Sequence, residues 1–478
     1  MVARSSRQKP PAGLHIHERP LPPKPPELAW RDYLIMLLKI AAELEQSLMV
    51  QYLYAAYSLG GDHAREHERK VHEWRDAILT IAREEMGHLL TVQNCICVLG
   101  GPLSFEREDY PWDTPYYPFE FCLEPLTRRS LAKYVFAEMP ATFTEDEKKY
   151  YAVAKAAKRE LGLPEGHPVG EVYDTIIEII SDPAKILDSD FDPGTYGIQA
   201  SFDDWGRGYR PGPFPPHAAP SDAPPPHERK TRVIITQMAT RTEAIAALKD
   251  VAGQGESPHH RAAVKDEPSH FVRFATIFHE LQQIQKKKKD WSPSRRVATN
   301  PVVAERGQAI KGSTPITAEP SRTWAALFNV RYRMLLSYLT HTFQLRRINL
   351  GKPDDLRPAI MSKVFGEMYN IKAIAGILVR LPIGGGKDPE RAGPPFQMPY
   401  TLVLPASEAD IWRQHRDLVT SSQKLVSALL DPNMKHHKDE TADGRQYLAV
   451  LRDLDLQSIA FIDEVLAGLR PVVRGGRK

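Results

Sequence analysis

The sequence predicts an all-α protein, organised as a helical bundle with long Pro-rich loops and additional helices toward the C-terminus. Two segments with dense apolar residues, at about residues 28–59 and 66–99, are long enough for helices of eight or nine turns. Each segment ends at a glycine pair, which is a common helix terminator. Carboxylates also recur inside the apolar stripes of these segments, where hydrocarbon is expected. A short strand is predicted at residues 233–235.

Composition narrows the class of protein. The 478 residues are 42% hydrophobic, which is enough for a sizeable core, and the formal charge of +3 is spread along the chain. We therefore expect no nucleic-acid partner. No uninterrupted apolar segment is long enough to span a membrane, and a signal peptide is not evident. Three cysteines fit a reducing compartment, and we expect a soluble, cytoplasmic protein with thiols in its core, namely Cys95, Cys97 and Cys122.

Changes in composition suggest four regions. Residues 1–27 form a Pro-rich arm, because proline blocks helix formation there. Residues 28–290 contain the candidate metal ligands and form the main bundle with inserted loops. Residues 291–322 are expected to be a linker, and residues 323–478 form a C-terminal helical region.

The first two predicted helices carry three candidate metal ligands. Glu45 lies in the stripe of apolar residues of the first helix. Glu85 and His88 form a Glu-x-x-His pair on the second, and at ~100° per residue their side chains leave the helix only about 60° apart. A buried, unpaired carboxylate costs several kcal/mol, which a bound metal ion would offset. The alternative is that Glu-x-x-His is an ordinary surface pair.

The rest of the chain continues the helical pattern. A helix from about Arg128 presents Glu138 on its apolar side before Pro140 ends it, which makes Glu138 a third-helix ligand candidate. Thr144 and Glu147 form a capping box for the next helix. A further helix is predicted at about 169–180, and a long loop at 182–229 follows it. Later helices are predicted at about 242–251, 269–285, 321–347, 356–380, 406–430 and 443–469.

Several strings of residues together resemble one known family. They are Ala41-Ala42-Glu43-Leu44-Glu45, the run from Gln51 to Ser58, Glu84-Glu85-Met86-Gly87-His88 in a helix that ends at Leu99-Gly100-Gly101, and Gly253-Gln254-Gly255-Glu256 followed by Ser269-His270-Phe271. This combination resembles the ferritin-like domain of the VioB-type iminophenyl-pyruvate dimer synthases. The resemblance covers roughly residues 28–290 and continues more weakly to about residue 400.

The resemblance implies a complete ligand set for two metal ions. The four candidates above fall on metal-ligand positions, and Glu256 and His270 would supply the last carboxylate and imidazole. The chain departs from the common ferritin pattern because a polar stretch separates Glu256 from His270. Glu171 and Glu178 are therefore alternative carboxylates. Tyr52 lies on almost the same face as Glu45 and is the candidate catalytic residue, with an ordinary core tyrosine as the alternative.

Carboxylate and imidazole ligands suit iron, about two ions per chain, or manganese. The sequence therefore predicts a dinuclear oxidase or oxygenase. The resemblance adds the substrate, a small amino-acid-derived, aromatic imine of specialised metabolism. The alternatives are a metal-storage protein, a metal-free accessory or binding protein, and a haem site with His341 as axial ligand. The C-terminal helices are expected either to complete a substrate pocket or to form a homodimer interface.

Overall fold

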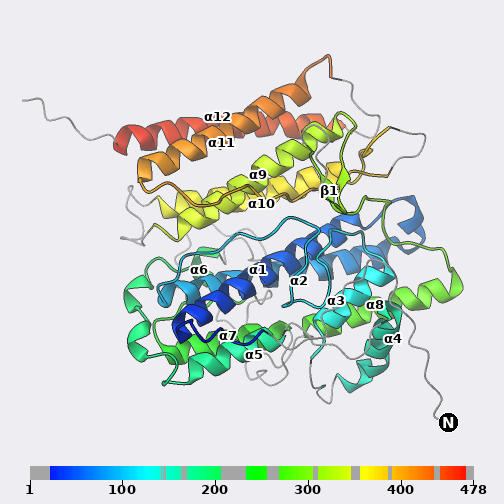
Figure 1. The fold of residues 1–478 in the computed structure, drawn as a ribbon. Coiled ribbons are helices and arrows are strands. Elements are labelled where there is room, and N and C mark those ends of the chain that lie inside the picture. The colour runs from blue at the N-terminus through cyan, green and yellow to red at the C-terminus, as the bar shows by residue number, and fades with distance from the viewer. Residues whose placement is uncertain are drawn as a thin grey trace, which may run out of the picture. The chain divides into compact units, whose positions relative to one another are not determined.

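The computed structural model describes residues 22–140, 143, 147–162, 170–205, 233–255, 268–304, 311–345, 356–385, 390–434 and 442–469 (Figure 1). The chain divides into two compact units, Met1–Asn300 and Pro301–Lys478. The all-α prediction is confirmed. Within the described ranges, the strands amount to one parallel pair, β1 (Pro301–Val302) and β2 (Thr314–Pro315).

Two long helices form the centre of the first unit. They are α1 (Trp30–Ser58) and α2 (Glu68–Val98), which pack along one another as an antiparallel pair (Figure 1). Both are buried on more than one side, as expected of central helices. The predicted glycine terminators are also confirmed. Gly60 and Gly100 have φ angles of 112° and 71°, a region that glycine enters without steric cost.

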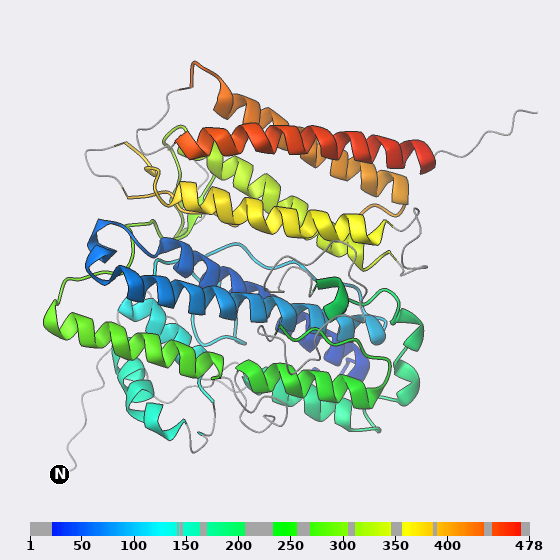
Figure 2. The same ribbon diagram turned by 180° about the vertical axis from the view of Figure 1, so that it is seen from behind.

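Shorter helices form the second layer of this unit. They are α3 (Arg128–Ala137), α4 (Tyr151–Leu161), α5 (Gly170–Ser181), the single turn α6 (Phe202–Trp205), α7 (Arg241–Gly255) and α8 (His270–Lys287). Helices α7 and α8 both pack against α2 and run end to end in Figure 2. Helix α5 packs on α1 and α7, and α3 packs on α8. Helix α7 continues four residues beyond the predicted end, and α3 stops one residue before Glu138.

The predicted strand at residues 233–235 is wrong. Residues 233–238 form an extended segment, here called the strap, which crosses α2 without pairing with another described strand. Side chains of α2 form hydrogen bonds with the backbone of the strap instead. The Thr91 hydroxyl donates to the carbonyl of Ile234 (3.1 Å) and accepts from the amide of Thr236 (3.2 Å), while the Asn94 amide donates to the carbonyl of Thr236 (2.9 Å).

The second unit contains four long helices. They are α9 (Ser321–Thr342), α10 (Arg357–Leu378), α11 (Glu408–Leu430) and α12 (Ala442–Leu469), and their bounds agree with the sequence prediction to within five residues. Helix α9 packs against α10 and α11, and α11 packs against α12. Among the helices of the described ranges, none is both long and apolar enough to cross a membrane.

Residues at the end of the first unit pack on its helices. The amide of Arg295 donates to the carbonyl of Ser58 (2.9 Å), and that of Asn300 donates to the carbonyl of Leu123 (2.9 Å). The hydroxyl of Tyr54 donates to the carbonyl of Ala298. The first ten residues of the segment 291–322 are therefore tied to the first unit.

Candidate metal centre

Helices α1 and α2 build the first half of the candidate centre. Glu45 projects from α1, and Glu85 and His88 project from α2, all three almost completely buried. Nδ1 of His88 lies 2.9 Å from Oε2 of Glu85 and 3.4 Å from Oε2 of Glu45. The helical spacing expected from the sequence thus places a carboxylate and an imidazole of α2 opposite a carboxylate of α1.

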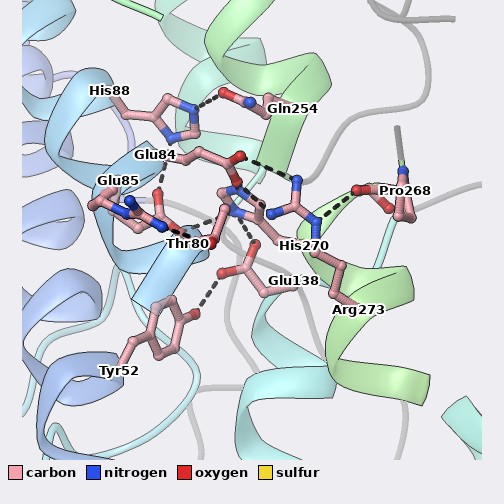
Figure 3. Close-up of polar contacts among 12 residues, drawn as sticks. Tyr52, Thr80, Glu84, Glu85, His88, Glu138, Gln254, Pro268, His270 and Arg273 are labelled. Carbon is pink, nitrogen blue, oxygen red and sulfur yellow. Dashed lines mark hydrogen bonds and ion pairs between the residues drawn. The ribbon is translucent and has the colours of Figure 1, made fainter. Parts of the chain in front are cut away.

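The ends of two shorter helices build the second half. Glu138 directly follows α3, and His270 is the first residue of α8, whose N-terminus the Ser269 side chain caps. Nδ1 of His270 lies 3.0 Å from Oε1 of Glu85 and 3.6 Å from Oε2 of Glu138 (Figure 3). Glu85 therefore faces both histidines, one with each oxygen.

A tyrosine hydroxyl supports the outer carboxylate of each half. Tyr52 donates to Oε1 of Glu138, as Figure 3 shows, and Tyr173 of α5 donates to Oε1 of Glu45. The ring of Tyr52 packs against Tyr134, with ring centroids 4.9 Å apart. Tyr52 was a candidate from the sequence, whereas Tyr173 was not.

The outward nitrogens of the two histidines also have buried partners. Nε2 of His88 lies 3.0 Å from Oε1 of Gln254, near the end of α7. Nε2 of His270 lies 3.0 Å from Oε2 of Glu84, which also accepts a hydrogen bond from Arg273 (Figure 3). The sequence pattern did not single out Glu84, Gln254 or Arg273 as functional, although two of them stand in the strings that carry the family resemblance.

Burial and mutual charge shift the pKa values of these groups. Burial and the nearby charge of Glu85 raise the pKa of Glu45 to about 7. Burial alone would lower the pKa of His88, but the carboxylates of Glu45 and Glu85 raise it to about 10. Burial likewise opposes the effect of Glu85 on His270, whose pKa is nevertheless raised well above its usual value. The buried carboxylates therefore favour a positively charged group, either a protonated histidine or a metal ion, at the centre.

Two observations indicate that the cluster could hold a metal ion: some of its buried polar atoms lack hydrogen bonds, and its donors are carboxylates and imidazoles. Within the described part of the chain, Oε2 of Glu45, Oε1 of Glu85 and Nδ1 of His270 are buried and have no hydrogen-bond partner, although they lie close together. Two sets can each converge on one ion, namely Glu45 with Glu85 and His88, and Glu85 with Glu138 and His270. Carboxylate and imidazole donors suit iron or manganese. Without a metal ion, the ion pairs between these histidines and carboxylates compensate the buried atoms, but their hydrogen bonding stays incomplete.

Other predicted residues fall outside this cluster. Glu256 lies outside the described residues, but Gly255 before it is beside the centre, because a Cβ on Gly255 would lie 3.8 Å from Oε2 of Glu138. Of the alternative carboxylates, Glu178 is exposed and pairs with Lys185 (3.2 Å).

The free cysteines and His341 do not offer metal ligands. Cys95 and Cys97 are buried, as expected of core thiols, and burial raises the pKa of each to about 12. His341 lies 3.0 Å from His415 through Nδ1 and 3.0 Å from Glu408 through Nε2. Both ring nitrogens are therefore engaged, which argues against the haem alternative.

A helical bundle with paired carboxylate and histidine ligands in its core is the arrangement of ferritin-like metal proteins. The chain belongs to the ferritin-like family, whose model matches residues 38–279. It is 26% identical over 405 residues to a dichlorochromopyrrolate synthase from Lentzea aerocolonigenes, a match that covers 78% of this chain and 36% of the relative.

A second relative matches a shorter stretch of the chain. Over 151 residues the chain is 31% identical to a 2-imino-3-(indol-3-yl)propanoate dimerase from Chromobacterium violaceum, which covers 26% of this chain and 15% of the relative. The chain thus matches little more than a third of the length of the first relative and less than a sixth of the second. The predicted resemblance to the VioB-type proteins is confirmed. No solved structure gives a significant match.

Proposed function

We propose that the chain is a dinuclear-metal oxidase or oxygenase that acts on a small, amino-acid-derived aromatic imine, with iron as the expected metal and manganese as the alternative. The observation that carries this proposal is Glu85, which presents one oxygen to each of two buried histidines. A carboxylate placed between two such sets is suited to bridging two ions. Bound there, two metal ions would share the electrons of oxygen or peroxide reduction.

The chain's own groups would position the reactants. Tyr52 keeps its proton, because burial and the charge of Glu138 raise its pKa well above the usual value. Its hydroxyl is therefore a hydrogen-bond donor at the edge of the centre, and we propose that it is the catalytic residue. Burial of the ligands also excludes bulk water from the reacting atoms.

The charge of the centre fits a substrate with a carboxylate. As ligands, Glu45, Glu85 and Glu138 would contribute three negative charges against the four positive charges of two divalent ions. One further carboxylate, from Glu256 or from the substrate, would complete the balance. An imine derived from an amino acid carries such a group.

The substrate class and reaction rest on the relatives. One is named for dimerising 2-imino-3-(indol-3-yl)propanoate and the other for making dichlorochromopyrrolate. We propose that this chain takes part in a similar oxidative coupling of imines in specialised metabolism. These relatives do not favour the alternative of a storage or metal-free accessory protein.

The test is substrate-dependent consumption of oxygen or peroxide by the metal-loaded protein, with 2-imino-3-(indol-3-yl)propanoate generated in the assay. Glu85→Gln should abolish consumption, because it removes the shared carboxylate. Glu43→Gln is the matched control, since Glu43 lies on the same helix but accepts a hydrogen bond from the amide of Glu108 (3.1 Å), away from the centre. Equal turnover in the two variants would contradict the proposal, as would a loaded wild-type protein that consumes no oxidant.

A further inference from the structure

The two halves of the candidate centre are built alike except at one place. Each half has a histidine that points Nδ1 at Glu85, and each has an outer carboxylate that accepts from a tyrosine. In both halves Nε2 points outward to an oxygen acceptor. That acceptor requires the proton on Nε2, so a neutral ring presents the lone pair of Nδ1 to the centre.

The acceptors behind the histidines differ in charge. His88 faces Oε1 of Gln254, an amide, whereas His270 faces Oε2 of Glu84, a carboxylate (Figure 3). Both acceptors are more than nine-tenths buried, so water does not screen the difference in charge between them. A carboxylate behind a metal-bound histidine fixes the ring and increases its basicity more than an amide does.

Arg273 holds Glu84 in place. Its Nη1 and Nη2 donate to the two oxygens of Glu84 at 2.7 and 3.2 Å, and its Nε donates to the carbonyl of Pro268 (2.9 Å). This bidentate contact keeps the carboxylate of Glu84 oriented toward His270. Charge from His270 and Arg273 also outweighs burial and keeps the pKa of Glu84 below its usual value.

We propose that Glu84 makes the metal position at His270 the tighter of the two, so that it fills first, while Gln254 leaves the position at His88 weaker. Glu84 and Gln254 are then positioning residues, which act through the histidines they contact. This inference rests on the proposed dinuclear centre. It also implies that a partly loaded chain holds its metal at His270.

Titration of the metal-free full chain with Co(II) tests the inference without an activity assay. Visible absorption and competition with a chelator should resolve two binding steps in the wild type. Glu84→Gln should weaken the tighter step about 10- to 100-fold. Gln254→Glu should tighten the weaker step, a gain of affinity that misfolding cannot produce. Glu43→Gln repeats the carboxyl-to-amide change away from the centre and should alter neither step.

The position that fills first can be located directly. Crystals grown with one equivalent of Mn(II) should show anomalous density beside His270. Density beside His88, or a tighter step that Glu84→Gln leaves unchanged, would overturn the inference. Two equal steps in the wild type would overturn it while leaving the dinuclear centre intact. A wild-type chain that binds no Co(II) would overturn the dinuclear proposal itself.

Discussion

Glu85 is the residue on which both halves of the centre depend, because each of its oxygens faces a different histidine. Its pKa is lowered, since the positive charge of His270 outweighs the effect of burial. A carboxylate at this point can serve both proposed metal positions. The residues around it have more specialised tasks, and these can be separated by single substitutions.

Tyr52→Phe tests the proposed catalytic hydroxyl. The variant keeps the ring that packs on Tyr134 and Phe274 and loses only the donor to Glu138. We expect kcat to fall about 100-fold with metal content unchanged, because a positioned proton donor contributes about 10²- to 10⁴-fold. Tyr173→Phe removes the equivalent hydrogen bond to Glu45 and is the control. A fall of the same size in both variants would reduce Tyr52 to a structural role.

Periodicity could find some of these residues and not others. Glu85 and His88 share a helix, so their common face follows from 3.6 residues per turn. Glu84 is rotated by about 100° from Glu85, and nothing in the local pattern shows that α8 covers that face. Tyr173 reaches Glu45 across 128 positions of sequence, a contact that only the tertiary fold creates.

At the scale of elements, the strap and α2 approach each other closely at Gly87. A Cβ at this position would lie 2.7 Å from both the carbonyl oxygen of Ile234 and Cγ1 of Val233. The glycine stands between Glu85 and His88, so strap and ligands are packed together. The sequence predicted a strand here because three β-branched residues follow one another, but their backbone partners are helix side chains.

Gly87→Ala should therefore destabilise the first unit by about 1–3 kcal/mol through overpacking, although alanine favours helix more than glycine does. Gly366→Ala on α10 is the control, because a Cβ there meets no atom within 4 Å. It should stabilise its helix by up to about 1 kcal/mol. Urea unfolding followed by circular dichroism measures both. A stabilising Gly87→Ala would show that the strap does not lie as described.

The helices of the second unit meet at a buried ionic network. Arg331 of α9 donates to Glu367 of α10 (3.0 Å) and to Asp455 of α12 (2.6 Å), and Ser422 of α11 donates to Asp455 (3.0 Å). Arg331→Met removes the guanidinium that pairs with two buried carboxylates. We expect a loss of about 3–5 kcal/mol in the free energy of unfolding.

Arg416→Met is the matched control for that substitution. It removes an exposed ion pair with Asp463 (2.6 Å), which should have no measurable effect on unfolding. Calorimetry would compare the two variants with the wild type. Equal unfolding temperatures for Arg331→Met and Arg416→Met would mean that the network does not hold the four helices together.

At the scale of the whole molecule, the second unit should become less stable as the pH falls. Burial and the nearby charges of His341 and Lys363 lower the pKa of His415 well below its usual value. The unfolded chain therefore binds a proton at His415 that the folded chain excludes. Above about pH 6.5, His415 does not affect the free energy of unfolding. Below that pH the free energy of unfolding should decrease, by up to about 1.4 kcal/mol per pH unit.

Urea unfolding between pH 8 and pH 5 measures this slope. His415→Gln should flatten it, whereas His279→Gln, at an exposed position of α8, should not. A slope that is the same in all three proteins would contradict the assigned state of His415.

The helical architecture was predictable because long, strongly periodic segments identify helices with few errors. The division at Asn300 was not predictable, since it depends on how the residues after α8 pack on the first unit.

A cytoplasmic location and a homodimer remain predictions. Sedimentation velocity would test the homodimer, which a single species of about 54 kDa would contradict.

The dinuclear centre is tested most directly by the metal content of the full chain, purified without chelators and measured by elemental analysis. The proposal predicts about two iron or manganese ions per wild-type chain. It also predicts their loss in Glu85→Gln and their retention in Glu43→Gln. A folded wild-type chain that contains no metal and takes up neither Fe(II) nor Mn(II) would contradict it.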